Sequence, residues 1–232
     1  MTDESLFDRP STCDASMTTA TLSRRDRERR ARRRAMLDAA LVVFAEKGFD
    51  GATLDEIAER AEFGKGTLYN YFPDGKEAIL FALFDEVFEG MAALIRDHFA
   101  EAEEQPIRES FHGLIGRLLH HFTENQETFF LLIKEAQRLM LTQHEHVAAL
   151  HRHRDRSIDA LVEPIERAVE AGELRPFPPH AIAHMLLGNV KGYLMYSCPT
   201  PGCDEPAPGF ATLDEATDFI TTILFEGLLP RD

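Results

Sequence analysis

Hydrophobic residues recur at every third or fourth position along most of the chain, as on the buried face of an α-helix. No stretch alternates between hydrophobic and polar residues in the way that a β-strand does. The spacing predicts helices over about residues 25–47, 54–61, 65–72, 76–102, 106–122, 127–141, 144–171, 178–196 and 211–229. We expect Pro164 to kink or break the seventh of these. The predicted fold is all-α, with a three-helix head followed by a six-helix domain.

Two short helices joined by a tight turn are predicted in the stretch TLDEIAERAEFGKGTLYNYF. Thr53 and Glu56 have the spacing of a capping box, which marks the start of a helix at the next residue. The turn contains Gly64, which can cap the second short helix. Leu68 and Phe72 share one face of that helix, so both are expected to point at the core.

The opposite face of the second short helix is small, polar and aromatic. Gly66 and Asn70 lie away from the core, with Thr67 and Tyr69 on the flanks. Glycine allows close approach to a groove, an asparagine amide can pair with a base edge, and hydroxyl groups can donate to phosphates. The pattern predicts a helix-turn-helix that binds DNA. An alternative remains open, in which a helical ligand-binding or scaffolding protein uses the same head to contact another protein.

Charge is distributed unevenly along the chain. The net charge is −15, yet eight arginines fall within residues 24–34, RRDRERRARRR. Residues 24–80 carry twelve basic and eleven acidic residues, whereas residues 81–232 carry twelve basic and twenty-five acidic ones. Positive charge therefore lies beside the predicted helix-turn-helix, while the acidic remainder should be repelled by DNA.

This asymmetry also indicates the domain organisation. Residues 1–23 are rich in Ser, Thr and Asp, and we expect them to be a disordered arm. Residues 24–75 form the predicted DNA-binding head, and residues 76–232 a domain for effector binding and dimerisation. The chain has no apolar run long enough to span a membrane, no pattern of a secretory signal, and only three cysteines. We therefore expect a cytoplasmic protein.

The stretches LDAALVVFAEKGFDGATLDEIAERA and GKGTLYNYFPDGKEAIL resemble the head domain of the TetR family of tetracycline-repressor-like regulators. The resemblance implies a homodimeric repressor that binds double-stranded DNA at a palindromic operator and is released by a small apolar or amphipathic ligand. By the family pattern, bases are approached by Lys65, Gly66, Thr67 and Asn70, and phosphates are held by Thr53, Tyr69, Tyr71 and Lys76. Gly75 is one residue more than the family pattern has before the helix that begins at Lys76.

The domain after the head offers candidates for an effector pocket and for a dimer interface. Residues that could line an apolar cavity or orient a ligand are Phe111, Phe122, Phe130, Ile133, Leu161, Asn189 and Tyr193. The last two predicted helices are apolar on more than one side, so they must be covered on both sides. A four-helix interface in a twofold dimer would cover them, through Ile182, Leu186, Val190, Ile220, Ile223 and Leu224. The alternative is a central helix pair buried within one chain.

No other chemistry is indicated by the sequence. The two H-x-H pairs, at residues 144–146 and 151–153, are poor chelators because positions i and i+2 of a helix point apart. The GKGT at residues 64–67 fails as a phosphate loop, since Glu59 and Gly66 stand where that motif needs glycine and Ser or Thr. We therefore expect no metal, no cofactor and no enzymatic activity.

Overall fold

The computed structural model describes residues 23–103, 105–142, 144–197, 210 and 212–227. Over these residues all regular structure is helical, and structural relatives share this all-α class, so the predicted fold class is confirmed. The helices are α1 (Arg24–Gly51), α2 (Leu54–Arg60), α3 (Lys65–Tyr71), α4 (Lys76–Glu101), α5 (Ile107–Glu124), α6 (Gln126–Thr142), α7 (His144–Glu170), α8 (Pro179–Ser197) and α9 (Leu213–Glu226). The predicted arm lies outside the described residues except for Ser23, whose hydroxyl caps α1.

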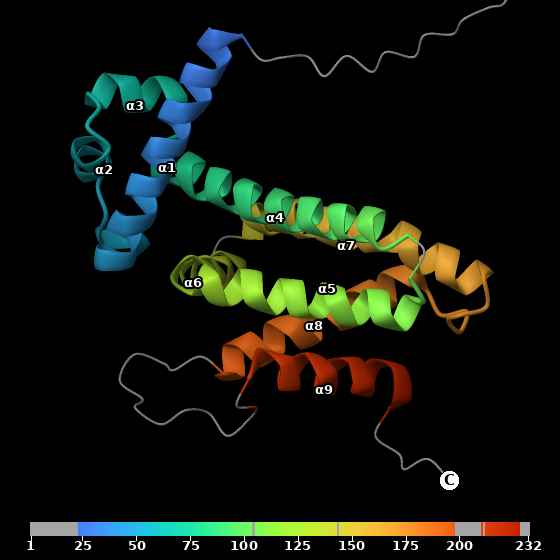
Figure 1. Cartoon of the computed structure of the whole chain (residues 1–232). Helices are drawn as coiled ribbons and strands as arrows, with labels where there is room; N and C mark the ends of the chain where they lie inside the picture. The colour runs from blue at the N-terminus through green and yellow to red at the C-terminus, as the bar shows by residue number, and fades with distance from the viewer. Residues whose placement is uncertain (1–22, 104, 143, 198–209, 211, 228–232) are drawn as a thin grey trace, which may run out of the picture.

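The first three helices form the head at one end of the molecule, and α4 leads from the head into the rest of the chain (Figure 1). There α4 packs along α7, α5 packs on α9, and α8 contacts α5, α7 and α9. We refer to α5–α9 together with the second half of α4 as the body.

A glycine ends the first long run of α1, as the sequence predicts. Gly48 has a φ of 71°, a backbone conformation that side chains with a Cβ rarely adopt. Beyond it the chain turns so that the rings of Phe44 and Phe49 meet with their centroids 5.3 Å apart. This is the hydrophobic contact that accompanies a Schellman-type end of a helix.

The predicted capping box at α2 is present. The Thr53 hydroxyl accepts a hydrogen bond from the Glu56 backbone N–H at 3.3 Å, and the Glu56 carboxylate accepts one from the Thr53 N–H at 3.0 Å. Hydrogen bonds from Lys47 and then from Thr53 lower the pKa of the Glu56 carboxyl, so this carboxylate is charged at neutral pH. The following turn places Glu62 at a φ of 58°, and Gly64 occupies the N-cap position of α3.

The core of the head is completed by helices of the body. Buried residues of α1, α2 and α3 pack with Ile79 and Phe84 of α4, and also with Leu132, Leu139 and Leu150 of α6 and α7. Packing therefore crosses the predicted boundary after residue 75, and the head is held against the body by a shared core.

A second core lies within the body. Its largest buried members include Phe99, Phe111, Leu161 and Ile165. Of the two outcomes predicted for Pro164, a kink or a break, the break is wrong, because α7 continues through this residue to Glu170. A proline removes only one backbone hydrogen bond, and burial of the flanking Leu161 and Ile165 holds both sides of the helix in place.

No helix within the described part of the chain is both long and apolar enough to cross a membrane.

Replacing Gly48 by alanine should destabilise the protein by about 1–3 kcal/mol, because the added Cβ would have to occupy a positive-φ conformation. Gly90, inside α4 with open space around a built Cβ, provides the matched control. Its change to alanine should be neutral or stabilise by up to about 1 kcal/mol. Urea unfolding at equal protein concentrations measures both, and equal effects would contradict the role given to Gly48.

Candidate functional site

The outer face of α3 is open to solvent because its inner face is anchored. Leu68 and Phe72 are buried in the core of the head, as predicted. On the other side Gly66 and Asn70 are exposed, and Tyr69 retains 42 % of its side-chain exposure. Apart from its chain neighbours and the backbone of α3, no atom lies within 4 Å of a Cβ built on Gly66. The α3 backbone at this position is therefore open to close approach by another molecule.

Three polar residues surround this face. Lys65 pairs with Asp55 of α2 at 2.7 Å, and this hydrogen bond raises the pKa of the Lys65 ammonium. Thr67 is half-buried on the flank of α3. The Thr53 hydroxyl accepts the capping bond, which leaves its own O–H able to donate to a phosphate. These residues thus frame α3 from the side of α2.

Tyr71 lies at the other end of α3. It is half-buried, and the guanidinium of Arg29 from α1 sits 5.9 Å from the centre of its ring. This cation–π contact joins the end of α3 to the N-terminal part of α1.

Lys76 is used differently from the predicted phosphate contact. Its ammonium donates to the carbonyl groups of Phe49 at 2.8 Å and Asp50 at 3.2 Å, and it lies over the Phe49 ring. The extra residue before it, Gly75, has a φ of 73° and turns the chain there. Lys76 therefore holds the end of α1, where helix carbonyls need donors, and its predicted phosphate contact stays a prediction for the third N–H of its ammonium.

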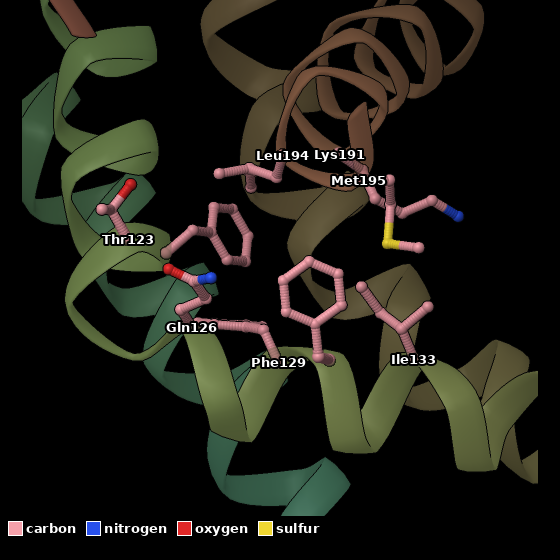
Figure 2. Close-up of a pocket in the computed structure, with 9 residues that line it drawn as sticks. Thr123, Gln126, Phe129, Ile133, Lys191, Leu194 and Met195 are labelled. Carbon is pink, nitrogen blue, oxygen red and sulfur yellow. The ribbon is translucent and has the colours of Figure 1, made fainter. Parts of the chain in front are cut away.

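A small apolar cavity lies between the ends of α5, α6 and α8 in the body (Figure 2). It is lined by Phe122, Thr123, Gln126, Phe129, Phe130, Ile133, Lys191, Leu194 and Met195, and we call it the effector cavity. Side chains of α6 and α8 face one another across it, and Lys191 lines it while its ammonium points away from the aromatic rings. Its volume of about 30 Å³ has room for one or two water molecules.

Three of the predicted ligand residues line this cavity, namely Phe122, Phe130 and Ile133. The other four do not. Phe111 and Leu161 fill the body core, where Phe111 makes edge-to-face contacts with neighbouring rings. Asn189 is exposed and donates to the Met185 carbonyl one turn back, and Tyr193 packs against the ring of Phe210.

Sequence reasoning missed six of the lining residues. On α5 and α6 they are Thr123, Gln126 and Phe129, and on α8 they are Lys191, Leu194 and Met195. Phe129 and Gln126 share a helix face with Ile133, so helical spacing from a predicted member could have found them. The residues of α8 had no such signal, because the sequence does not tell which part of α8 meets α6.

The structure also corrects the predicted dimer interface. Leu186, Val190 and Ile220 are buried in the core of a single chain, so they offer no surface to a partner. Ile182 and Leu224 are half-buried and pack against that core, and Ile223 is half-buried without belonging to it. The apolar side chains that α8 and α9 leave exposed are instead Met185, Met195, Tyr196 and Phe219.

The histidines give no metal site within the part of the chain that the structure describes, where no group of three or more possible metal-binding side chains is found. The side chains of His144 and His146 lie outside the described residues. His153 is packed between α4 and α7, 3.3 Å from Asp85, and burial lowers the pKa of its imidazole. His98 is buried against the Ser110 carbonyl at 2.7 Å, and burial lowers its pKa as well.

The head is a helix-turn-helix. It consists of a capped helix, a turn that contains glycine, and a second helix whose outer face is open and uncharged. Comparison with known proteins agrees with this class. The family described as bacterial regulatory proteins of the tetR family matches residues 36–83, and the tetracyclin repressor-like C-terminal domain matches residues 104–194. The chain belongs to the TetR family of helix-turn-helix transcriptional regulators.

Relatives span most of the chain. The regulator YhgD of Bacillus subtilis is 29 % identical over 67 % of this chain and 78 % of its own length. RutR of Escherichia coli is 25 % identical over 91 % of this chain and 97 % of its own. Among solved structures, FadR of Thermus thermophilus in complex with lauroyl-CoA superposes with a TM-score of 0.57. It is 25 % identical and covers 86 % of this chain and 96 % of its own.

The open space around Gly66 generates a test of the α3 face. Gly66→Ala should leave folding unchanged, since the new Cβ meets no atom of the protein. It should weaken binding to an operator by about tenfold or more, because the Cβ would stand between α3 and the groove. Fluorescence anisotropy measures the affinity, with Gly90→Ala as the control, and an unchanged affinity would contradict close approach at this position.

Proposed function

We propose that the protein is a homodimeric transcriptional repressor that acts in the cytoplasm and binds a palindromic operator. The observation that carries this proposal is the outer face of α3, where Gly66, Tyr69 and Asn70 are exposed on a helix anchored from behind. A helix of this kind fits the major groove, where asparagine can pair with adenine and tyrosine can donate to a phosphate. Two such heads would read half-sites one helical turn apart.

The proposed dimer forms through α8 and α9. Met185 and Tyr196 are each 58 % exposed on α8, and Phe219 on α9 is 48 % exposed. Exposed apolar side chains on neighbouring helices mark a surface that a partner covers. Gly188 and Gly192 on α8 leave open space, which lets a second copy of the helix approach closely. A twofold arrangement of α8 and α9 would bury this surface in a four-helix contact.

The proposed effector is an amphipathic molecule with an acyl chain and an anionic head, such as a fatty acyl thioester. A structural relative binds lauroyl-CoA. In this chain the effector cavity is lined by aromatic and aliphatic side chains, and the exposed Lys191 holds one positive charge outside it, directed away from the rings. An acyl chain could enter between the aromatic rings while its anionic head pairs with the ammonium.

The effector can act on the head through α6. At one end of α6 Phe130 and Ile133 line the cavity, and further along Leu139 packs in the core of the head. A cavity of about 30 Å³ is too small for an acyl chain, so binding must separate α6 from α8. The effector would then favour a position of α6 that differs from the DNA-binding one, and the operator would be released.

Binding to the DNA upstream of the protein's own gene tests the proposed function. The wild type should bind a palindromic segment there as two chains per site. Tyr69→Ala should weaken binding to all sequences alike, because a phosphate contact carries no sequence information. Asn70→Ala should instead reduce the preference for the operator over a mutated half-site, by about 1–3 kcal/mol per half-site.

Anisotropy titrations on operator and scrambled DNA measure both effects, and light scattering gives the number of chains bound. The reverse pattern would show that the roles of Tyr69 and Asn70 are wrongly assigned. A protein that binds no DNA at any salt concentration would contradict the repressor and favour a head that contacts another protein.

Lys191 generates a separate test of the effector. Lys191→Gln should raise the concentration of lauroyl-CoA that releases the operator by about fivefold, which corresponds to the loss of one partly exposed charge pair. Lys134→Gln is the matched control, since Lys134 is exposed on α6 and does not line the cavity. Equal responses of the two variants, or release that needs no acyl chain, would contradict this effector class.

A further inference from the structure

The first three turns of α1 bury no residue in the core of the head. The helix begins at Arg24, yet its first buried residue is Met36, and the family match to the head also begins at residue 36. We call residues 24–35 the α1 extension. Figure 1 shows it passing the end of α3 and continuing outward. It contains all eight arginines of the basic run, so its length and charge are features of this chain rather than of the matched family region.

The arginines nearest the head serve to hold the helix in place. Arg33 and Arg34 each pair with the carboxylate of Glu86 on α4 at 3.0 Å, and Arg33 also lies 5.6 Å from the centre of the Phe72 ring. Two pairs of this kind fix the direction in which the extension leaves the head. Arg34 also pairs with Asp38 at 2.9 Å, so two carboxylates balance these two charges within the protein.

A second group of arginines faces the end of α3. Arg25, Arg29 and Arg32 follow one another at i, i+4 and i+7, so they share one face of the extension. Together with Tyr71 they line an open hollow in the surface, with a volume of about 620 Å³. We call this hollow the arginine concavity. Within the described residues no carboxylate forms an ion pair with Arg25 or Arg32.

Two carboxylates also line the arginine concavity, and both are engaged locally. Asp26 accepts a hydrogen bond from the Ser23 hydroxyl at 2.6 Å, and Glu28 pairs with Arg24 at 2.9 Å. The three arginines therefore leave this surface with an excess of positive charge. A guanidinium offers five N–H donors in a plane, which suits a phosphate that can accept two of them.

We propose that the arginine concavity binds the phosphate backbone of the DNA that flanks the half-site read by α3. This inference rests on the proposed function, because it takes α3 to lie in the major groove. Tyr71 belongs to α3 and to the concavity at once, so a duplex laid on the outer face of α3 continues directly onto the extension. The extension then adds phosphate contacts outside the base pairs that α3 can reach.

The reach of the extension sets the size of the effect. Twelve residues of helix, from 24 to 35, measure about 18 Å at about 1.5 Å per residue. At about 3.4 Å per base pair this corresponds to at most about five base pairs on each side of the operator.

Two double variants with the same change in charge distinguish phosphate binding at the arginine concavity from nonspecific electrostatic attraction to DNA. Arg25→Gln with Arg32→Gln removes charge from the concavity, and Arg27→Gln with Arg30→Gln removes it from the other side of the extension. All four side chains are exposed, and circular dichroism and melting temperature check that both variants fold. Each is titrated in full-length form with the minimal operator and with the operator extended by five base pairs at each end, across a range of salt concentrations.

For the wild type the added flanks should raise affinity by about tenfold or more at low salt. The Arg25 and Arg32 variant should lose this gain. Its plot of log affinity against log salt should become shallower by about 0.9 per contact, or about 3.6 for four contacts in a two-headed protein. The Arg27 and Arg30 variant should keep most of the affinity gained from the flanks and most of the salt dependence.

Equal losses in the two variants would overturn the proposal, because they would show a diffuse effect of net charge. A wild type whose affinity ignores the flanks would overturn it as well. Both of these results differ from a failure of the proposed function, in which the wild type would not prefer its operator over scrambled DNA of the same length.

Discussion

The arrangement of this molecule depends on a core that two parts of the chain share. The head supplies Phe44, Ile57 and Leu68, but Leu132 and Leu139 of α6 close the same core from the body. A head of about fifty residues buries only a small share of its surface, so the apolar partners supplied by the body add to its stability. The position of the head is therefore fixed by packing rather than by the α3–α4 connection. Any displacement of α6 must change that packing, because interiors are close-packed and do not deform continuously.

Charged residues of the head divide into those that stabilise it and those that remain available to a partner. Lys76 holds the carbonyl groups at the end of α1, and Arg33 and Arg34 are paired with Glu86. What remains on the surface beside α3 is the positive charge of the α1 extension, on a chain whose total charge is −15. The acidic body is repelled by DNA, so attraction at the head and repulsion elsewhere together orient the molecule as it approaches a duplex.

Local features of the structure could be predicted from the sequence, and features that depend on distant packing could not. The capping box at Thr53, the glycine end at Gly48 and the anchoring of Leu68 each follow from a few neighbouring residues, and each is observed. The contacts of Lys76 could not be predicted in this way, since its partners lie 26 and 27 residues earlier in the chain. The burial of Leu186 and the lining of the cavity could not be predicted either. Hydrophobic spacing shows that a helix face is covered, but it does not show which helix covers it.

The dimensions of the effector cavity constrain how a signal could reach the head. Because the cavity holds only about 30 Å³, a ligand with an acyl chain cannot bind without moving the rings that line it. Phe130 and Ile133 belong to α6, and α6 also carries Arg138, which lies 4.9 Å from the centre of the Phe49 ring at the end of α1. The buried Glu135 pairs with this arginine at 2.6 Å and holds it against the ring. The proposed separation of α6 from α8 would therefore act on the head at two points, the shared core and the end of α1. The coupling free energy can be no larger than the difference in ligand affinity between the two positions of α6.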